Sequence, residues 1–201
     1  MTITLIIIAL TAIISFTAFS NEKLVNDLIF YPPALTQQKQ WYRFISCGFI
    51  HADLTHLIFN MFSMYMFGKF VEEAFASIFD SKSTIIFLAL YISALVVSLL
   101  PTYFKHKNDD HYSSLGASGA VSAVVFAGIF LFPTAKIGIF ILPPIIPGFI
   151  FAPIYLLVSA QLEKKGGDNV NHSAHIWGSL YGVAFVIIAS FALSSFNPIE
   201  K

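Results

Sequence analysis

Long apolar stretches separated by short polar clusters dominate the pattern of this chain. No Asp, Glu, Lys or Arg occurs in residues 1–21, 83–104, 111–135, 137–162 and 169–199, and a shorter gap of this kind covers residues 54–68. A membrane-spanning helix needs roughly 20 apolar residues, and long charged side chains at its ends can reach the interface. The pattern therefore predicts six membrane helices, at about residues 2–19, 52–77, 83–101, 119–132, 147–162 and 173–195, in one domain over residues 1–201.

The composition agrees with an all-α membrane protein. Hydrophobic residues make up 57% of the 201 residues and charged residues only 11%, with a mean hydropathy of +0.77, whereas soluble domains carry about 25% charged residues. The net charge is zero, so no basic face indicates a nucleic-acid partner. The single cysteine, Cys47, excludes an internal disulfide and a multi-cysteine metal site.

Two connecting segments depart from the helical pattern. Four prolines fall in residues 133–147, too many for one regular helix, so a connector is expected over residues 133–146. Residues 20–49 mix aromatic side chains with a Pro-Pro pair, which is typical of a segment in the membrane interface. A partly re-entrant first loop is expected there.

Basic residues do not fix the orientation of the chain in the membrane. With a cytoplasmic N-terminus, the inside segments hold 4 Lys and Arg residues and the outside segments hold 7. The positive-inside rule favours the opposite orientation.

Polar side chains within the expected helices are the candidate functional residues, because burying such groups in a bilayer is costly. His56 and Asn60 lie four residues apart and share one helix face. They are candidates either for donating hydrogen bonds in a site or for bonding between helices. His51, near the helix start, is expected to be structural.

The sequence Gly-Ala-Ser-Gly-Ala places Ser118 at the start of the fourth expected helix. A helix N-terminus stabilises developing negative charge, which suits a nucleophile. Small residues of this kind are also common where membrane helices touch. Glycine allows the tight turn and close backbone approach that either interpretation needs.

The sixth expected helix carries His175, followed by Gly178 and Gly182 at GxxxG spacing. This spacing lets two helix backbones approach closely. With the fourth helix as partner, His175 would reach Ser118 and activate it as a general base. His172 lies one turn earlier and is expected to face solvent. Because no carboxylate lies within a span near His175, the expected arrangement is a dyad rather than a triad.

Four short motifs follow one another on the first loop and on the second, fourth and sixth expected helices: Trp41-Tyr-Arg43, His51-x4-His56-x3-Asn60, Gly116-x-Ser118-Gly119 and Ala174-His175-x2-Gly178-x3-Gly182. Each motif alone is weak, but the ordered set with six spans is specific. Over about residues 41–182 the chain therefore resembles the rhomboid family of intramembrane serine proteases.

The resemblance implies a rhomboid-like six-helix bundle, with a cytoplasmic N-terminus in a bacterial-type inner membrane. It also implies a serine endopeptidase that uses a Ser118–His175 dyad, with an oxyanion hole of the Ser118 backbone N–H and the side chains of His56 and Asn60. The expected substrates are transmembrane proteins that enter near the second and fifth helices, and no cofactor is expected. Supporting roles are expected for Gly116, Gly119, Gly178, Gly182, His51, Trp41, Arg43 and Glu72, with Glu72 at the end of the second helix.

Some positions depart from the family pattern. Ser122 stands where relatives usually carry an aromatic residue that packs against the catalytic imidazole, so the sequence leaves open what holds the His175 ring. Phe126 and Ala76 stand where glycine is usual, and Trp177 is bulky within the His175 motif. These departures predict altered packing or rate, because the serine and the histidine are both present.

Water must reach the serine within the bilayer. The expected helix over residues 119–132 is about 21 Å long, shorter than the roughly 30 Å hydrocarbon core. Ser118 is therefore expected below the membrane surface, where residues 106–115 line protein or a water-filled cavity.

Other functions remain open at this point. A His₃ metal site of His51, His56 and His175 is disfavoured, because five-residue spacing does not place two imidazoles on one helix face and no HExxH motif occurs. A catalytically inactive rhomboid-like protein, or a transporter acting by binding, would use the same residues as contacts between helices.

Overall fold

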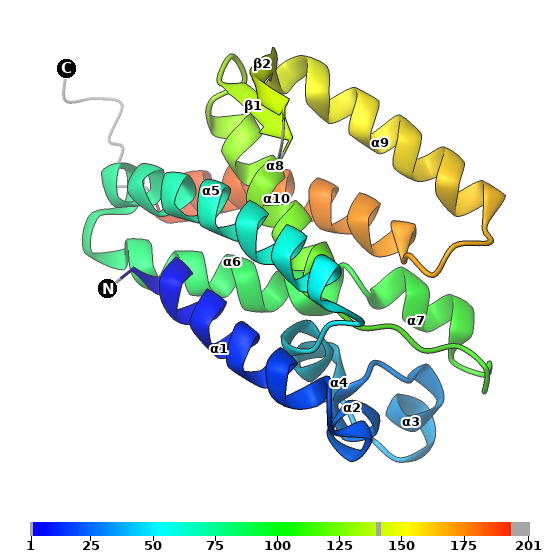
Figure 1. Cartoon of the computed structure of the whole chain (residues 1–201). Coiled ribbons are helices and arrows are strands. Elements are labelled where there is room, and N and C mark those ends of the chain that lie inside the picture. Colours follow the sequence, from blue (N-terminus) through cyan, green and yellow to red (C-terminus); the bar gives the residue numbers. More distant parts are fainter. Residues whose placement is uncertain (1, 140–141, 194–201) are drawn as a thin grey trace, which may run out of the picture.

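Each of the six apolar stretches carries one long helix in the structure, a computed structural model that describes residues 2–139 and 142–193 (Figure 1). The long helices are α1 (Ile3–Ala18), α5 (Leu54–Phe79), α6 (Ser83–Val97), α8 (Ser118–Leu131), α9 (Gly148–Lys165) and α10 (His172–Leu193). The predicted end of the last helix, residues 194–195, lies outside the described residues.

Only part of the helical content meets a strict length and hydropathy test for spanning a membrane. Within the described residues, the stretch Leu54–His106 and the helix His172–Leu193 pass it. Two further helices, α1 and α8, are apolar but shorter than 18 residues. The structure thus supports a largely helical chain rich in apolar segments, while the number of spans remains a prediction.

Local sequence explains where the first helices begin. The Thr2 hydroxyl accepts from the Leu5 N–H and caps α1, and the Asp53 carboxylate accepts from the His56 N–H at 2.8 Å and caps α5. Such side-chain oxygens satisfy the free N–H groups of a first helical turn. Asp53 therefore fixes the start of α5 three residues before His56.

The first loop is built of short helices. They are α2 (Glu22–Leu28), α3 (Pro32–Gln37), α4 (Arg43–Ser46) and the 3-10 turn η1 (Cys47–Phe49). Phe30, Leu35 and Phe44 form a buried cluster with residues of α6 and α7 (Leu100–His106). Figure 1 shows these helices gathered at one end of α1.

Two connections differ from expectation. The third helix was predicted to reach residue 101, but α6 ends at Val97 and α7 begins at Leu100, with Pro101 in its first turn, where its missing N–H costs nothing. A second 3-10 turn, η2 (Asp80–Lys82), joins α5 to α6.

The connector over residues 133–146 contains an antiparallel hairpin, so the fold is not purely helical. Strand β1 (Lys136–Ile139) pairs with β2 (Leu142–Pro147) in the register Lys136↔Pro147 and Ile137↔Ile146. Proline removes a hydrogen bond from a helix interior, and several close together prevent a regular helix, but proline is accepted in a strand at the edge of a sheet. The prolines therefore predict the loss of helix correctly, but not the strand pairing.

Helix α8 occupies the interior of the bundle. Most of its residues are buried, and the buried core around it includes side chains from α5, α6 and α10. Many of its residues are Gly, Ala, Ser or Val, so neighbouring backbones can come close. Helix α9, yellow in Figure 1, lies on the outside of the bundle and packs against α8 and α10.

Candidate active site

Ser118 is the first residue of α8, and a strained turn leads into it. Gly116 has φ +114°, in the left-handed region that favours glycine, and a Cβ there would lie 2.7 Å from Cε1 of His56. The Gly116 N–H also donates to the Cys47 carbonyl at 2.9 Å. Both the backbone conformation and the close His56 ring therefore require glycine two residues before the serine.

The His175 imidazole meets the Ser118 hydroxyl. His175 Nε2 and Ser118 Oγ are 2.9 Å apart, although the residues are 57 positions apart in sequence. The Ser179 hydroxyl donates to the His175 carbonyl at 2.8 Å, one turn further along α10. A serine at a helix N-terminus in hydrogen-bond contact with an imidazole has the geometry of an activated nucleophile.

Backbone-to-backbone packing of α8 on α10 makes this contact possible. A Cβ on Gly178 would collide with the Gly119 carbonyl, and a Cβ on Gly182 would collide with the Ala123 carbonyl. This is the close approach that the GxxxG spacing predicts. On the α8 side, a Cβ on Gly119 would meet the Ser98 hydroxyl and come 3.3 Å from the Ala174 carbonyl.

His56 and Asn60 lie on α5, facing the serine turn and the protein interior respectively. The His56 ring packs on Gly116, as described above. Asn60 is buried, and its amide Nδ2 donates to the His56 carbonyl within the same helix at 3.1 Å. Of the two residues, His56 therefore has the direct contact with the turn that carries the nucleophile.

His51 lies beside His56, contrary to the reasoning from residue spacing. The two rings are 4.9 Å apart at 75°, because His51 precedes α5 in a non-helical segment and can turn back onto it. His51 Nδ1 is 2.9 Å from the Ser15 hydroxyl of α1. Among the described residues, no group of three His, Cys, Asp or Glu side chains is placed to hold a metal ion.

His172 is buried rather than solvent-facing, so the prediction for it is wrong. It is the first residue of α10; its Nε2 is 3.0 Å from the Asp168 carboxylate, and its ring lies 5.7 Å from that of His175 in an edge-to-face arrangement. The hydrogen bond from His172 holds the pKa of Asp168 below its usual value. The loop before α10 folds back over the helix start, a path that sequence spacing does not reveal.

Trp41 and Arg43, from the first-loop motif, make contacts that stabilise the loop. Arg43 is buried, and its guanidinium donates to the carbonyls of Asn26 and Ile29 at 2.8 Å each and to the Gln40 side chain at 2.5 Å. Trp41 is half exposed and stacks on Phe44. Arg43 thus closes the loop by satisfying backbone carbonyls.

Glu72 lies within α5 rather than at its end, because the helix continues to Phe79. Its two carboxylate oxygens accept from the backbone N–H groups of Ile3 at 2.8 Å and Thr4 at 3.1 Å. These are free N–H groups of the first turn of α1, where the helix dipole also favours a negative charge. Glu72 therefore fixes the N-terminus of α1 against α5.

A small cavity of about 20 Å³ lies beside Ser118, large enough for one water molecule. Its lining includes Ser98 and Asn171. The Asn171 side-chain oxygen accepts from the Thr102 hydroxyl and the Ala174 N–H, while its Nδ2 is buried without a partner among the described residues. This cavity therefore offers space for one water, with some polar groups in a partly apolar lining next to the nucleophile.

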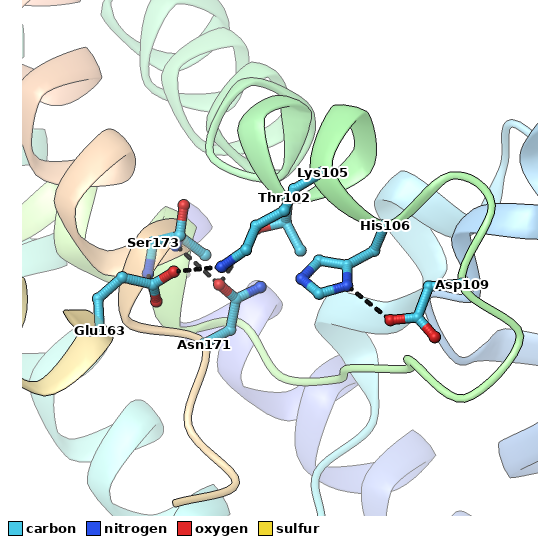
Figure 2. A network of polar contacts seen from close by, with 8 residues as sticks. Thr102, Lys105, His106, Asp109, Glu163, Asn171 and Ser173 are labelled. Carbon is cyan, nitrogen blue, oxygen red and sulfur yellow. Dashed lines mark hydrogen bonds and ion pairs between the residues drawn. The ribbon is translucent and has the colours of Figure 1, made fainter. Parts of the chain in front are cut away.

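Reasoning from the sequence missed a polar network at the ends of α7, α9 and α10, shown in Figure 2. Glu163, near the end of α9, accepts from the Ser173 N–H at 3.0 Å and from Lys105 Nζ at 3.1 Å. At the end of α7, His106 Nδ1 lies 2.9 Å from the carboxylate of Asp109 in the adjoining loop. Glu163 thus joins the end of α9 to the first turn of α10, two residues before His175.

Tyr155 of α9 was also missed. Its ring lies 6.5 Å from the His175 ring at an interplanar angle of 27°, and its hydroxyl is 3.1 Å from the Ser122 hydroxyl. The unusual serine at position 122 was the available signal that another residue must approach His175. Which helix would supply that residue could not be read from the sequence.

A family model described as the Rhomboid domain matches residues 38–191, well over half of the chain. The chain belongs to the rhomboid family. Rhomboid proteins are integral membrane proteins that act on membrane-protein substrates within the bilayer, and most are serine proteases. The matched region contains every proposed dyad and oxyanion residue.

Several curated relatives agree with this assignment. The chain is 33% identical over 142 residues to the mitochondrial presenilin-associated rhomboid-like protein A of Danio rerio, covering 69% of this chain and 35% of the relative. It is 30% identical over 170 residues to the chloroplastic rhomboid-like protein 11 of Arabidopsis thaliana, covering 80% and 57%. It is 29% identical over 141 residues to YdcA, a candidate rhomboid protease of Bacillus subtilis, covering 69% and 62%. The chain thus spans between about a third and three fifths of the length of these relatives.

Proposed function

We propose that this rhomboid is an intramembrane serine endopeptidase that cleaves transmembrane segments with a Ser118–His175 dyad. The observation that carries the proposal is the 2.9 Å contact between Ser118 Oγ and His175 Nε2 at the N-terminus of α8. A hydrogen-bonded imidazole is what a serine needs to become a nucleophile near neutral pH. Membership of a family in which most proteins are serine proteases supports the same conclusion.

In this mechanism His175 Nε2 accepts the hydroxyl proton as Ser118 Oγ bonds to the scissile carbonyl carbon. The negative charge on the former carbonyl oxygen is stabilised by the Ser118 backbone N–H, with His56 and Asn60 as side-chain donors. The amide bond then breaks, and His175 returns its proton to the leaving amine. Asn60 Nδ2 carries two hydrogens, and only one of them is bonded to the His56 carbonyl, so the other is available to the oxyanion.

Hydrolysis of the acyl-enzyme completes the cycle. A water loses a proton to His175 and attacks the ester carbon, after which Ser118 recovers its proton. The cavity beside Ser118 can hold such a water. Since Ser98 and Asn171 line it, this water would have polar partners close to the reacting serine.

The same proposal includes the arrangement in the membrane. One rhomboid domain over residues 1–201 would span the bilayer six times, with α1, α5, α6, α8, α9 and α10 as spans. As in six-helix family members, the N-terminus would be cytoplasmic, in a bacterial-type inner membrane. The relatives from Danio and Arabidopsis are named as mitochondrial and chloroplastic proteins, so locating the tagged chain in its own cell tests this part separately.

Labelling with a fluorophosphonate tests the dyad. The detergent-solubilised wild type should gain one adduct by intact mass, whereas Ser118→Ala and His175→Ala should gain none. Ser113→Ala is the matched control, because Ser113 is an exposed serine in the preceding loop. Equal labelling of wild type and Ser118→Ala would refute an activated Ser118.

Cleavage of a transmembrane reporter in proteoliposomes tests the oxyanion hole. Loss of one oxyanion donor costs on the order of 10² to 10³ in rate, so Asn60→Ala should retain slow cleavage while Ser118→Ala retains none. If wild type neither labels nor cleaves while remaining folded, the chain is an inactive rhomboid-like protein that acts by binding.

A further inference from the structure

The position of an imidazole depends on what touches its ring as well as on its hydrogen bonds. In addition to Ser118, the His175 ring has two ring neighbours among the described residues. These are His172 from its own helix, edge-to-face at 5.7 Å, and Tyr155 from α9, offset-stacked at 6.5 Å. Both separations lie within the range of favourable contacts between ring systems. Tyr155 is the stacked neighbour that comes from a different helix.

Helix α8 holds Tyr155 in place. The Tyr155 hydroxyl is 3.1 Å from the Ser122 hydroxyl, and its ring lies 5.5 Å from that of Phe126. Ser122 and Phe126 follow Ser118 at intervals of four residues, so the three share one face of α8. The helix face that carries the nucleophile therefore also carries the site where Tyr155 docks.

Two unusual residues of α8 are explained by this docking. At position 122 a small side chain leaves room beside His175 and offers a hydroxyl to Tyr155. At position 126 a large ring packs against the phenol, and within α9 the Phe151 ring stacks on Tyr155 at 5.7 Å. Ser122 and Phe126 together form the surface of α8 against which Tyr155 of α9 packs.

We propose that Tyr155 is a positioning residue for His175, so that the geometry of the dyad depends on α9 being docked against α8 and α10. The inference rests on the proposed protease function. A stacked ring opposes rotation of the imidazole away from Ser118, and a misplacement of 1 Å can cost about 10²-fold in rate. Loss of the Tyr155 ring removes this restraint on the imidazole.

The C-terminal end of α9 has a second contact with the start of α10. Glu163 lies eight residues after Tyr155, about two helical turns away, and its carboxylate accepts from the Ser173 N–H and from Lys105 (Figure 2). Ser173 lies two residues before His175. Two separate contacts therefore connect α9 to the histidine of the dyad, one through Tyr155 and one through Glu163.

The test compares Tyr155 with a tyrosine of similar surroundings that does not touch the dyad. Tyr181 of α10 donates to the Ser93 hydroxyl at 2.7 Å and lies 6.0 Å from the Phe185 ring. Each tyrosine is changed to Leu and to Phe, and thermal stability is measured for all four variants. The rate constant of fluorophosphonate labelling is then measured against pH, and kcat and KM are measured with a transmembrane reporter.

Tyr155→Leu should slow labelling and lower kcat about 10- to 100-fold, shift the midpoint of the pH profile, and leave KM within about threefold. Tyr155→Phe keeps the stacked ring and should retain most of the rate. Tyr181→Leu should lower stability to a similar extent with an unchanged labelling rate. The proposal is overturned if folded Tyr155→Leu labels like the wild type, or if the two Leu variants slow labelling equally.

A second readout does not depend on activity. In a Ser118→Ala background, the His175 imidazole ¹⁵N signals should change with Tyr155→Leu and not with Tyr181→Leu, whereas identical His175 spectra would refute the contact. If the proposed protease function were wrong, the wild type itself would not be labelled. This result differs from an effect confined to the Tyr155 variants.

Discussion

The carboxylate of Glu72 offers the sharpest test of how α1 is held in the bundle. It accepts two hydrogen bonds, from the N–H groups of Ile3 and Thr4, at 2.8 and 3.1 Å. One turn earlier on α5, a Cβ on Gly68 would come 2.6 Å from the Thr4 hydroxyl oxygen, so α1 and α5 pack closely beside the Glu72 contact. Changing Glu72 to Gln removes one acceptor and the charge without changing the size of the side chain.

The expected cost follows from these two bonds. A hydrogen bond to a charged group contributes about 1.5–3 kcal/mol and a neutral one about 1 kcal/mol. The two bonds to the charged carboxylate together contribute at least about 3 kcal/mol, and Glu72→Gln keeps one neutral bond of about 1 kcal/mol. The free energy of unfolding should therefore fall by at least about 2 kcal/mol. For a chain of this size that corresponds to a fall in Tm of about 4–8 °C. Loss of the favourable charge at the helix N-terminus acts in the same direction.

The assay is thermal unfolding in detergent micelles, followed by intrinsic fluorescence. Glu73→Gln is the matched control, because Glu73 is the exposed neighbour on the same helix, and it should change the unfolding free energy by less than about 0.5 kcal/mol. Limited proteolysis should also cut Glu72→Gln earlier than the wild type near α1. Equal Tm values for the two variants would show that the Glu72 bonds contribute nothing to holding α1.

Three further predictions concern other contacts of the site described above. Gly178→Ala should abolish fluorophosphonate labelling and destabilise the fold by about 1–3 kcal/mol, because its Cβ collides with the Gly119 carbonyl, whereas Trp177→Ala on the exposed side of α10 should label normally. Glu163→Ala should lower Tm more than Lys105→Met, because the exposed ion pair contributes little while the Ser173 N–H loses its acceptor; equal shifts would contradict this. The pKa values of Asp168 and Asp109 are held down by hydrogen bonds from His172 and His106, so the unfolded chain binds more protons in acid. Their contribution is present above about pH 4 and is lost as pH falls through the folded pKa values; Asp168→Asn should therefore flatten the decline of Tm with acid, and an unchanged slope would count against the contact.

The sequence predicted the positions of the long helices well, because each of them follows an uninterrupted apolar run. The exact ends were less well predicted. Pro101 was expected to end a helix and lies instead in the first turn of α7, and α5 begins at Leu54 after the capping carboxylate of Asp53 rather than at residue 52. The prolines of the connector excluded a helix there. The pairing of β1 with β2 was not predicted, because it depends on contacts between two short segments rather than on either alone.

For the candidate site, short motifs predicted the residues but not all of their surroundings. The glycines of α10 indicated a close helix contact, and that contact brings His175 to Ser118. His172 was placed in solvent because nothing in the spacing shows that Asp168 returns over the start of α10. The stacking of Tyr155 depends on how α9 docks, which is a property of three packed helices.

The two residues of the proposed dyad meet through the packing of α8 on α10, and each has further contacts to a different part of the molecule. The serine turn is held by the first loop, since the Gly116 N–H donates to the Cys47 carbonyl and residues 30 and 114 exchange two backbone hydrogen bonds at 3.0 Å. His175 is held against α8 by the close packing of Gly178 and Gly182. It also has contacts to α9, through the Tyr155 ring and through the bond of Glu163 to the Ser173 N–H. A perturbation of the first loop should therefore displace Ser118, the nucleophile. A movement of α9 should instead displace His175, the base. Since Ser118 and His175 act only when they are in contact, the proposal predicts that loosening either set of contacts lowers the rate, while the packing of α8 on α10 keeps the two residues near each other.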